Sequence, residues 1–244
     1  MSLKWKLAAA MFAATAGVGS ANAGSLAYDA TLASPGYYNG TGNSSDHFTT
    51  YTDGGVELGL GVQYRYTGPQ VTPDAGTSTY HVNTGISTTN CATGCSLWNY
   101  EFSVNLGSSG HTLSDVSTTL TVLNVGNGNT FTVPVGLLDN TGYAGSSFHP
   151  ATSTDVGMQN SQNLGFFYVP IFDSGFGFNA LADDTYLLTL SVALNGGGSL
   201  GTVRATVVAG AGATPLPAAL PLFVSGLGVL GFMARRRRKP AAAA

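Results

Sequence analysis

Four histidines and twelve acidic residues supply the side chains of this 244-residue chain that could take part in acid–base chemistry. The histidines are His47, His81, His111 and His149. They are widely separated, and the sequence contains neither an HExxH zinc motif nor a GxSxG nucleophile motif. A catalytic triad can assemble from distant residues, so a secreted hydrolase stays open as an alternative. Because histidines in polar loops, such as His111, are usually solvated, we predict that the protein is not an enzyme.

Carboxylate pairs of the glycosidase type cannot be identified from the sequence. Asp183 and Asp184 are adjacent, which favours a turn before the strand that follows them. Calcium is an alternative, because the loops at residues 43–46 and 139–140 are rich in the oxygen ligands that this ion prefers. No DxDxDG pattern is present, so we predict solvated loops and no cofactor or metal.

Cys91 and Cys95 are the only cysteines of the chain. In an oxidising compartment, so close a pair predicts a local disulfide that holds a loop. Zinc is the less favoured alternative, since there is neither a second CxxC motif nor a suitably spaced histidine pair. Because the enclosed loop is short, the disulfide should contribute about 2 kcal/mol on the entropic account.

Four aromatic residues lie in Gly- and Asn-rich stretches that are typical of loops: Tyr37, Tyr38, Tyr143 and Phe148. Rings exposed there could stack on sugars, as in a sandwich-type lectin. The alternative is that these rings cover an edge of the core.

The charge of the chain is unevenly distributed. Seven of its nine basic residues lie near the two ends, and only Arg65 and Arg204 remain in residues 24–213. All twelve acidic residues lie between Asp29 and Asp184, so residues 24–213 have a net charge of −10 and no lysine. Such a surface repels nucleic acid and anionic lipid, and we predict no nucleic-acid partner.

Two segments that could position these side chains alternate strictly between apolar and other residues. They span residues 56–66 and 98–106. A period of two is typical of a strand with one buried face. We expect the opposite face, with Glu57, Glu101 and Asn105, to lie outside the core.

Weaker alternation predicts further strands at residues 26–32, 80–87, 117–125, 130–135, 164–172, 186–194 and 202–209. The Gly-rich segment 195–201 should join the last two strands as a hairpin. About nine strands with Gly-rich connections predict an all-β protein, an antiparallel β-sandwich or jelly-roll-like body with Thr, Ser and Asn on its outer faces.

The N-terminus has the features of a secretory signal peptide. Lys4 and Lys6 precede an apolar segment at residues 7–18, and Ala21 and Ala23 flank the position before a cut. The apolar segment is too short to cross a bilayer, which needs roughly 20 residues. We therefore expect cleavage by signal peptidase with Gly24 as the new N-terminus.

A second apolar segment, residues 216–234, carries no charge and ends in Arg235, Arg236, Arg237, Arg238 and Lys239. At about 1.5 Å per residue a helix of this length would span roughly 28 Å, enough to cross a membrane. Cations beyond a span stay in the cytoplasm, so we expect one transmembrane helix with its C-terminus inside.

The end of the chain resembles the PEP-CTERM sorting domain in its VPLPA form. The resemblance rests on Pro215, Leu216, Pro217 and Ala218, on the apolar span and on the basic cluster, in that order. It covers about 26 of the 244 residues, and Thr214 stands where the family usually has Val. Because Pro215 and Pro217 restrict the backbone to extended forms, the motif would suit a protease cleft.

The resemblance implies recognition by an exosortase, an integral-membrane cysteine protease or transpeptidase of Gram-negative bacteria, often encoded beside exopolysaccharide genes. The chain would then pause in the inner membrane before release to the cell surface or the medium.

These features divide the chain into a signal peptide (1–23), a β-sandwich domain (24–208), a linker (209–214) and a sorting tail (215–239). The hypothesis is a non-enzymatic surface or matrix protein, sorted by an exosortase and associated with exopolysaccharide or biofilm. The alternatives are a carbohydrate-binding module, a secreted hydrolase and a permanently anchored envelope protein.

Overall fold

The computed structural model describes residues 24–38, 43–66, 69–89, 91, 94–138, 141–166, 169 and 173–210. The predicted signal peptide (1–23), the sorting tail (215–239) and residues 139–140 lie outside this part, and of the predicted linker only residues 209 and 210 lie within it. Among the described residues, no helix combines the length and the apolar character needed to cross a membrane.

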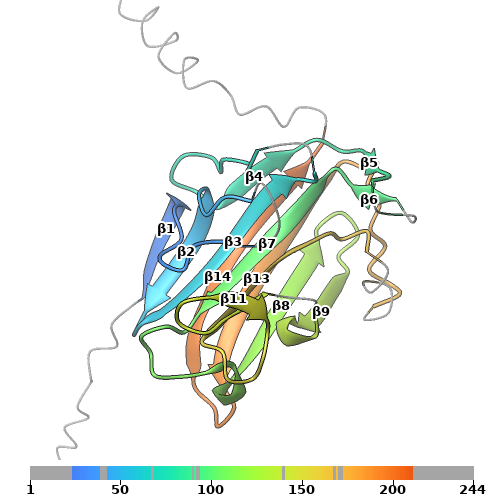
Figure 1. Ribbon diagram of the computed structural model, residues 1–244. Helices are drawn as coiled ribbons and strands as arrows, with labels where there is room; N and C mark the ends of the chain where they lie inside the picture. The colour runs from blue at the N-terminus through green and yellow to red at the C-terminus, as the bar shows by residue number, and fades with distance from the viewer. Residues whose placement is uncertain are drawn as a thin grey trace, which may run out of the picture.

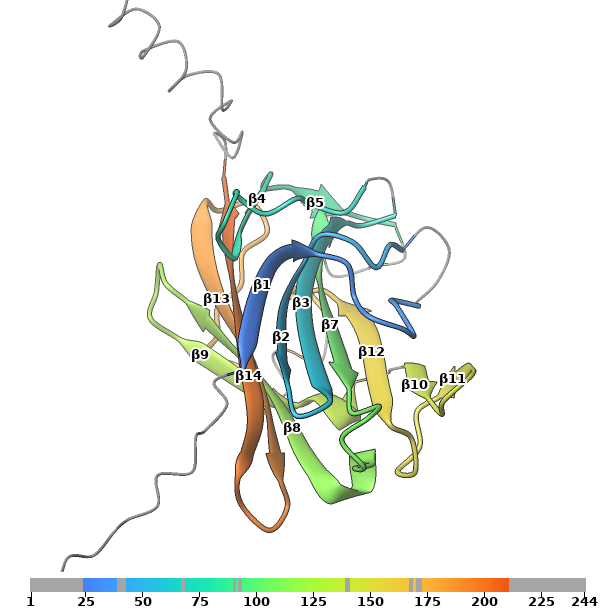
Figure 2. The same cartoon turned by 90° about the vertical axis from the view of Figure 1, so that its left-hand side faces the viewer.

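Two β-sheets lie face to face and form a sandwich (Figures 1 and 2). The first sheet has the strand order β1 (Ser25–Ala30), β2 (Phe48–Asp53), β3 (Val56–Tyr64), β7 (Trp98–Asn105), β12 (Gly157–Gln162), β10 (Thr141–Tyr143) and β11 (Phe148–Pro150). The second has the order β4 (Thr79–Val82), β14 (Ser199–Ala209), β13 (Asp184–Leu194), β8 (Val116–Asn124) and β9 (Thr130–Pro134).

Short elements complete the described fold. A small ribbon joins β5 (Ile86–Ser87) to β6 (Cys95–Ser96), and two 3-10 turns are η1 (Leu113–Asp115) and η2 (Val135–Leu137). Of the strand pairs in the described part, β4–β14 is parallel and the others are antiparallel.

Apolar side chains from both sheets meet in one buried core. Large aromatic residues dominate it: Trp98 of the first sheet lies 5.7 Å, between ring centroids, from Tyr186 of the second. The Phe178 ring also lies 5.7 Å, between ring centroids, from Tyr186. Because burying one large apolar side chain contributes roughly 1.5–3 kcal/mol, this packing is the main force that joins the two sheets.

The all-β class and the two strongest strands agree with the sequence prediction. Strand β3 ends at Tyr64, two residues before the predicted end, and Tyr66 is exposed with a φ of 59°. The predicted hairpin is formed by β13 and β14, paired along nearly their full length. Cys91 and Cys95 are joined by the predicted disulfide, with their Cα atoms 5.9 Å apart.

The predicted strand at residues 164–172 is wrong in its described part. Residues 164–166 form a turn, in which the Asn163 side chain accepts hydrogen bonds from the amides of Gly165 (2.9 Å) and Ser96 (3.1 Å). Leu164 is buried in the core. The apolar residues there therefore serve the packing of a turn against β6.

Besides the two-residue strand β6, four described strands were not predicted: β2, β10, β11 and β12. Their residues are largely polar, as in Phe48–Asp53 and Gly157–Gln162, so they lack the apolar alternation that identifies a strand with a single buried face.

Glu57, Glu101 and Asn105 lie outside the core, as expected, but not on a face that is open to solvent. Residues 31–38 and 43–47, here named the cover segment, lie across that face (Figure 2). Glu101 is 0 % exposed as a result, and every residue of β7 is buried.

The cover segment crosses three neighbouring strands in order and bonds to each. The Ala33 amide donates to the carboxylate of Glu57 on β3 (3.1 Å). Asn105 on β7 donates to the Ser34 carbonyl (3.2 Å). The amide side chain of Gln159 on β12 donates to the Gly36 carbonyl (2.6 Å) and accepts from the Tyr38 amide (2.7 Å). These backbone groups of the cover segment are thus paired although they lie against a sheet.

Two glycines of β3 make room for the apolar residues that anchor this segment. Leu32, Tyr37 and Phe48 form a small buried cluster on the outer face of the sheet. A Cβ at Gly59 would lie 2.7 Å from Leu32, and one at Gly61 would lie 2.9 Å from Phe48. Strand β3 therefore has glycine at the two outward-facing positions against which Leu32 and Phe48 pack.

A side chain at position 61 should displace Phe48. We expect Gly61→Val to lower the free energy of unfolding by about 1–3 kcal/mol, because the added atoms have no space. Gly196→Ala is the matched control: its Cβ would meet no atom within 4 Å, and its effect should stay within about 1 kcal/mol. Urea unfolding measures both, and equal midpoints for the two variants would contradict the packing of Phe48 on β3.

Candidate functional site

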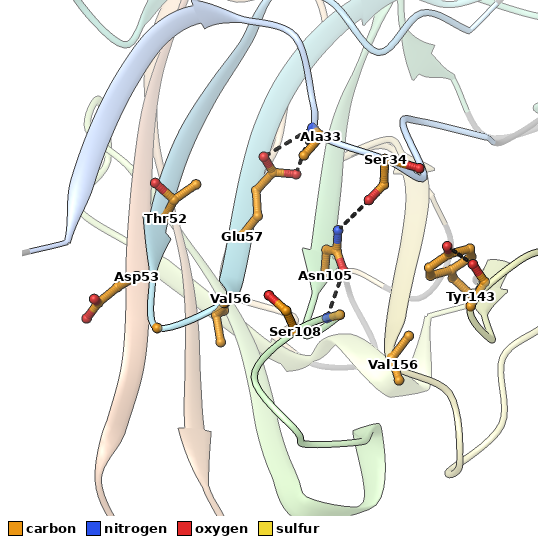
Figure 3. Close-up of a pocket in the computed structure, with 14 residues that line it drawn as sticks. Ala33, Ser34, Thr52, Asp53, Val56, Glu57, Asn105, Ser108, Tyr143 and Val156 are labelled. Carbon is orange, nitrogen blue, oxygen red and sulfur yellow. Dashed lines mark hydrogen bonds between the residues drawn. The ribbon is translucent and has the colours of Figure 1, made fainter.

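A cavity of about 720 Å³ lies where the cover segment meets one end of the first sheet (Figure 3). Its walls come from the cover segment, the β2–β3 turn, the loop after β7 and the β10–β11 hairpin. The lining residues are Ala33, Ser34, Thr52, Asp53, Gly54, Gly55, Val56, Glu57, Asn105, Gly107, Ser108, Tyr143, Gly145 and Val156.

The β2–β3 turn is built from Gly54 and Gly55, whose φ angles are 53° and 84°. Positive φ at both central residues is the requirement of a two-residue hairpin turn of type I′, and glycine meets it without strain. A Cβ at Gly55 would lie 2.7 Å from the backbone of Ser108. The two glycines therefore also bring the turn against the loop after β7.

Polar groups in the cavity are held in place by the cover segment. Asn105 accepts from the Gly107 amide (2.9 Å) through its side-chain oxygen while its amide group donates to Ser34. The Glu57 carboxylate is half-buried above the cavity, and burial raises its pKa although the bond from the Ala33 amide lowers it. The cavity thus has hydrogen-bond donors and acceptors in fixed positions.

Three of the four aromatic residues noted in the sequence gather beside this cavity. Tyr38 stacks on Phe148 with ring centroids 4.8 Å apart, and Tyr143 lies 5.5 Å from Phe148. Tyr38 is 60 % exposed, and Tyr143 lines the cavity itself. We name Tyr38, Tyr143 and Phe148 the aromatic edge. The fourth residue, Tyr37, is buried against Phe48 and covers the core.

The hairpin that carries Tyr143 and Phe148 is fixed by one buried carboxylate. Asp155 is 1 % exposed, accepts from the Thr152 amide (2.7 Å) and lies 3.0 Å from His149 Nε2. A Cβ at Gly142 would lie 2.5 Å from the backbone of Ala151 beside this carboxylate. His149, expected to be solvated, therefore helps to hold the aromatic edge.

Two other histidines also pair with aspartates. His47 lies 2.5 Å from Asp29, and His81 lies 2.9 Å from Asp74. His149 Nδ1 donates to the Pro150 carbonyl (2.7 Å), so the ring nitrogen opposite its aspartate is occupied by the backbone. A triad requires a hydroxyl at the ring nitrogen opposite the aspartate, and among the described residues none of these three pairs has one there.

The loop proposed for calcium uses its acidic side chain internally. Asp46 accepts hydrogen bonds from Thr31 (2.5 Å) and Ser44 (3.2 Å), and the bond from Thr31 is the main cause of its lowered pKa. Within the described part of the chain, no three His, Cys, Asp or Glu residues gather as a metal-binding group.

Comparison of the whole chain with protein-family models and with curated proteins finds no match. The site must therefore be interpreted from its own geometry.

Sequence reasoning singled out the aromatic edge but missed the rest of the site. Glu57 and Asn105 were assigned to strands and expected on their outer faces, yet nothing indicated that these strands pair with each other at those two positions. The Gly-Gly pair after Asp53 was the available signal, since it predicts a tight hairpin next to Glu57.

One buried carboxyl links the cover segment to the strands below it. Gln70 donates to the Ser44 carbonyl (3.1 Å) and to Glu101, which lies in the middle of β7. Burial raises the pKa of Glu101 from an ordinary 4.5 to about 8, outweighing the bond from Gln70. In the folded protein this carboxyl therefore keeps its proton up to neutral pH.

The stability of the fold should depend on the proton of Glu101. Between pH 4.5 and about 8 the unfolded chain loses this proton while the folded chain retains it. The free energy of unfolding should therefore fall with rising pH, by up to about 1.4 kcal/mol per pH unit from this group.

Glu101→Gln, which cannot ionise, should lack this contribution. Urea unfolding across the same pH range should therefore show the native chain losing stability relative to the variant as pH rises from 4.5 to about 8. Parallel curves would refute the buried, protonated state of Glu101.

Proposed function

We propose that this chain is an exported, non-enzymatic protein of the cell surface or extracellular matrix that binds polysaccharide at the aromatic edge and the adjoining cavity. The observation that carries the proposal is a group of three adjacent aromatic rings, one of which, Tyr143, lines a cavity that also contains fixed hydrogen-bonding groups. Tyr and Phe rings offer an apolar face to the C–H face of a sugar, while fixed polar groups nearby can bond its hydroxyls.

A binding role is favoured over catalysis by the way the acidic and basic groups are used. Asp155 and His149 hold the hairpin, Glu57 and Asn105 hold the cover segment, and Asp46 closes a loop. These groups position the rings and the walls of the cavity. The cavity can then select and orient a sugar chain without transforming it.

Export and sorting are supported by the two ends of the chain. The signal-peptide pattern with cleavage before Gly24, the predicted span at residues 216–234 and the resemblance to the PEP-CTERM domain together favour exosortase processing after a pause in the inner membrane. A lysine-free, acidic β domain with a local disulfide suits an oxidising location outside the cytoplasm. The proposed location next to exopolysaccharide agrees with a sugar-binding edge.

Removing rings from the aromatic edge should weaken binding to polysaccharide. We expect Tyr38→Ala, Tyr143→Ala and Phe148→Ala each to reduce affinity by about 1–2 kcal/mol, or roughly five- to thirtyfold, because central aromatic contacts dominate such interfaces. Affinity electrophoresis in gels that contain the host's extracellular polysaccharide measures the effect.

Tyr66→Ala is the matched control for Tyr38→Ala, since Tyr66 is as exposed as Tyr38 but follows the far end of β3. Retention that is unchanged by all three ring deletions, or lost equally in the control, would count against the aromatic edge as the binding surface.

Processing should remove both ends of the chain. We expect the intact mass of the protein from the host envelope and medium to correspond to Gly24 as first residue and to lack the residues beyond the Pro215–Ala218 motif. Deleting the exosortase should preserve the tail. A chain that ends at Ala244 in the exosortase-producing host would instead indicate a permanent anchor.

A further inference from the structure

The charged side chains that line the cavity are both negative. Asp53 lies at the β2–β3 turn and Glu57 at the start of β3, and no Lys or Arg is among the lining residues. Opposite charges in a partly enclosed cleft attract a ligand, and like charges repel it. The cavity therefore disfavours a ligand with carboxylate or sulfate groups.

The two arginines of residues 24–213 lie away from the cavity and do not offset its negative charge. Arg65 is 4 % exposed, and its guanidinium lies 4.9 Å from the centre of the Phe166 ring, at the other end of β3 from Glu57. Arg204 is exposed on β14, in the opposite sheet. With a net charge of −10 over residues 24–213, the field around the aromatic edge is negative at long range as well.

Glu57 retains the capacity to bind a cation. Both of its oxygens accept from the Ala33 amide at 3.1 Å, which fixes their direction. A carboxylate has about four acceptor positions, so further N–H donors can still bond to it. A protonated amine is the sugar substituent that combines such donors with a positive charge.

We propose that the polysaccharide bound at the aromatic edge carries free amino groups, as in a partly deacetylated hexosamine polymer, and that Glu57 accepts one of them in the cavity. This inference rests on the proposed sugar-binding function and adds the class of ligand. Tyr143, which lines the same cavity and contacts Phe148, would hold the ring of the sugar whose amine reaches Glu57.

The test compares three oligosaccharides of equal length near neutral pH and at low ionic strength: hexamers of glucosamine, of N-acetylglucosamine and of a uronic acid. The full-length chain is solubilised in a polyoxyethylene detergent, which contains no sugar, and affinities are measured by isothermal titration calorimetry. We expect the glucosamine hexamer to bind most tightly and the uronate hexamer not at all. Added salt should reduce the preference for glucosamine, because it screens the ionic contact.

Glu57→Gln separates the specific contact from general attraction by an acidic protein. The variant should bind the glucosamine hexamer about three- to fivefold more weakly, and its loss of affinity for the N-acetylglucosamine hexamer should be smaller, because that hexamer has no charged amine to pair. Asp173→Asn, which removes the same charge from a loop that does not line the cavity, is the control and should leave both affinities nearly unchanged.

Equal affinity for the two hexosamine polymers, equal losses in Glu57→Gln and Asp173→Asn, or binding of the uronate with or without calcium would overturn the inference and leave the sugar-binding function standing. Failure of all three hexamers and of the host's own polysaccharide to bind would refute both.

Discussion

The contact between the cover segment and the outer face of the first sheet determines how the rest of this molecule is arranged. A sheet in a sandwich normally has one face against the core and one in water. Here the central strand β7 is buried on both faces, and its second face carries polar side chains. Burying such groups is unfavourable unless they find partners. Asn105 donates to the Ser34 carbonyl of the crossing chain, Ser103 accepts from Gln159, and Glu101 accepts from Gln70.

The candidate site follows from that contact. The first residues of the cover segment, Ala33 and Ser34, form one wall of the cavity, and Tyr38 continues to the edge where it stacks on Phe148. Asp155 fixes the hairpin on the opposite side. The site therefore joins segments that are more than a hundred residues apart in sequence, and the hydrogen bonds of Gln159 to Gly36 and Tyr38 connect them directly.

Features encoded by neighbouring residues were predictable from the sequence. The alternation of β3 and β7, the hairpin of β13 and β14 and the disulfide between Cys91 and Cys95 all depend on local spacing. The polar strand β12 was not predictable, because its sequence shows no apolar period: Gln159 bonds to the cover segment, and Ser161 accepts from Gln63 and Asn99.

The candidate site likewise has residues that the local sequence could indicate and an arrangement that depends on distant contacts. Tyr38, Tyr143 and Phe148 could be noted as loop aromatics, but their convergence depends on strand pairings that no local pattern specifies. Glu57 and Asn105 face each other because β3 pairs with β7 in one register, and their burial depends on a distant loop. The turn at residues 164–166 shows the converse, since apolar residues that pack a turn imitate a strand.

The position of β14 in the second sheet affects the order in which the strands can pair when the N-terminus is exported first. This strand lies between β4 and β13 and is the last of the described strands in the sequence. If the chain is exported as proposed, β13 pairs only with β8 until residues 199–209 have crossed the membrane, and β4 waits more than a hundred residues for its partner in the sheet. The first sheet could then form early, whereas the second sheet, and with it the sandwich, would be completed only after β14 emerges.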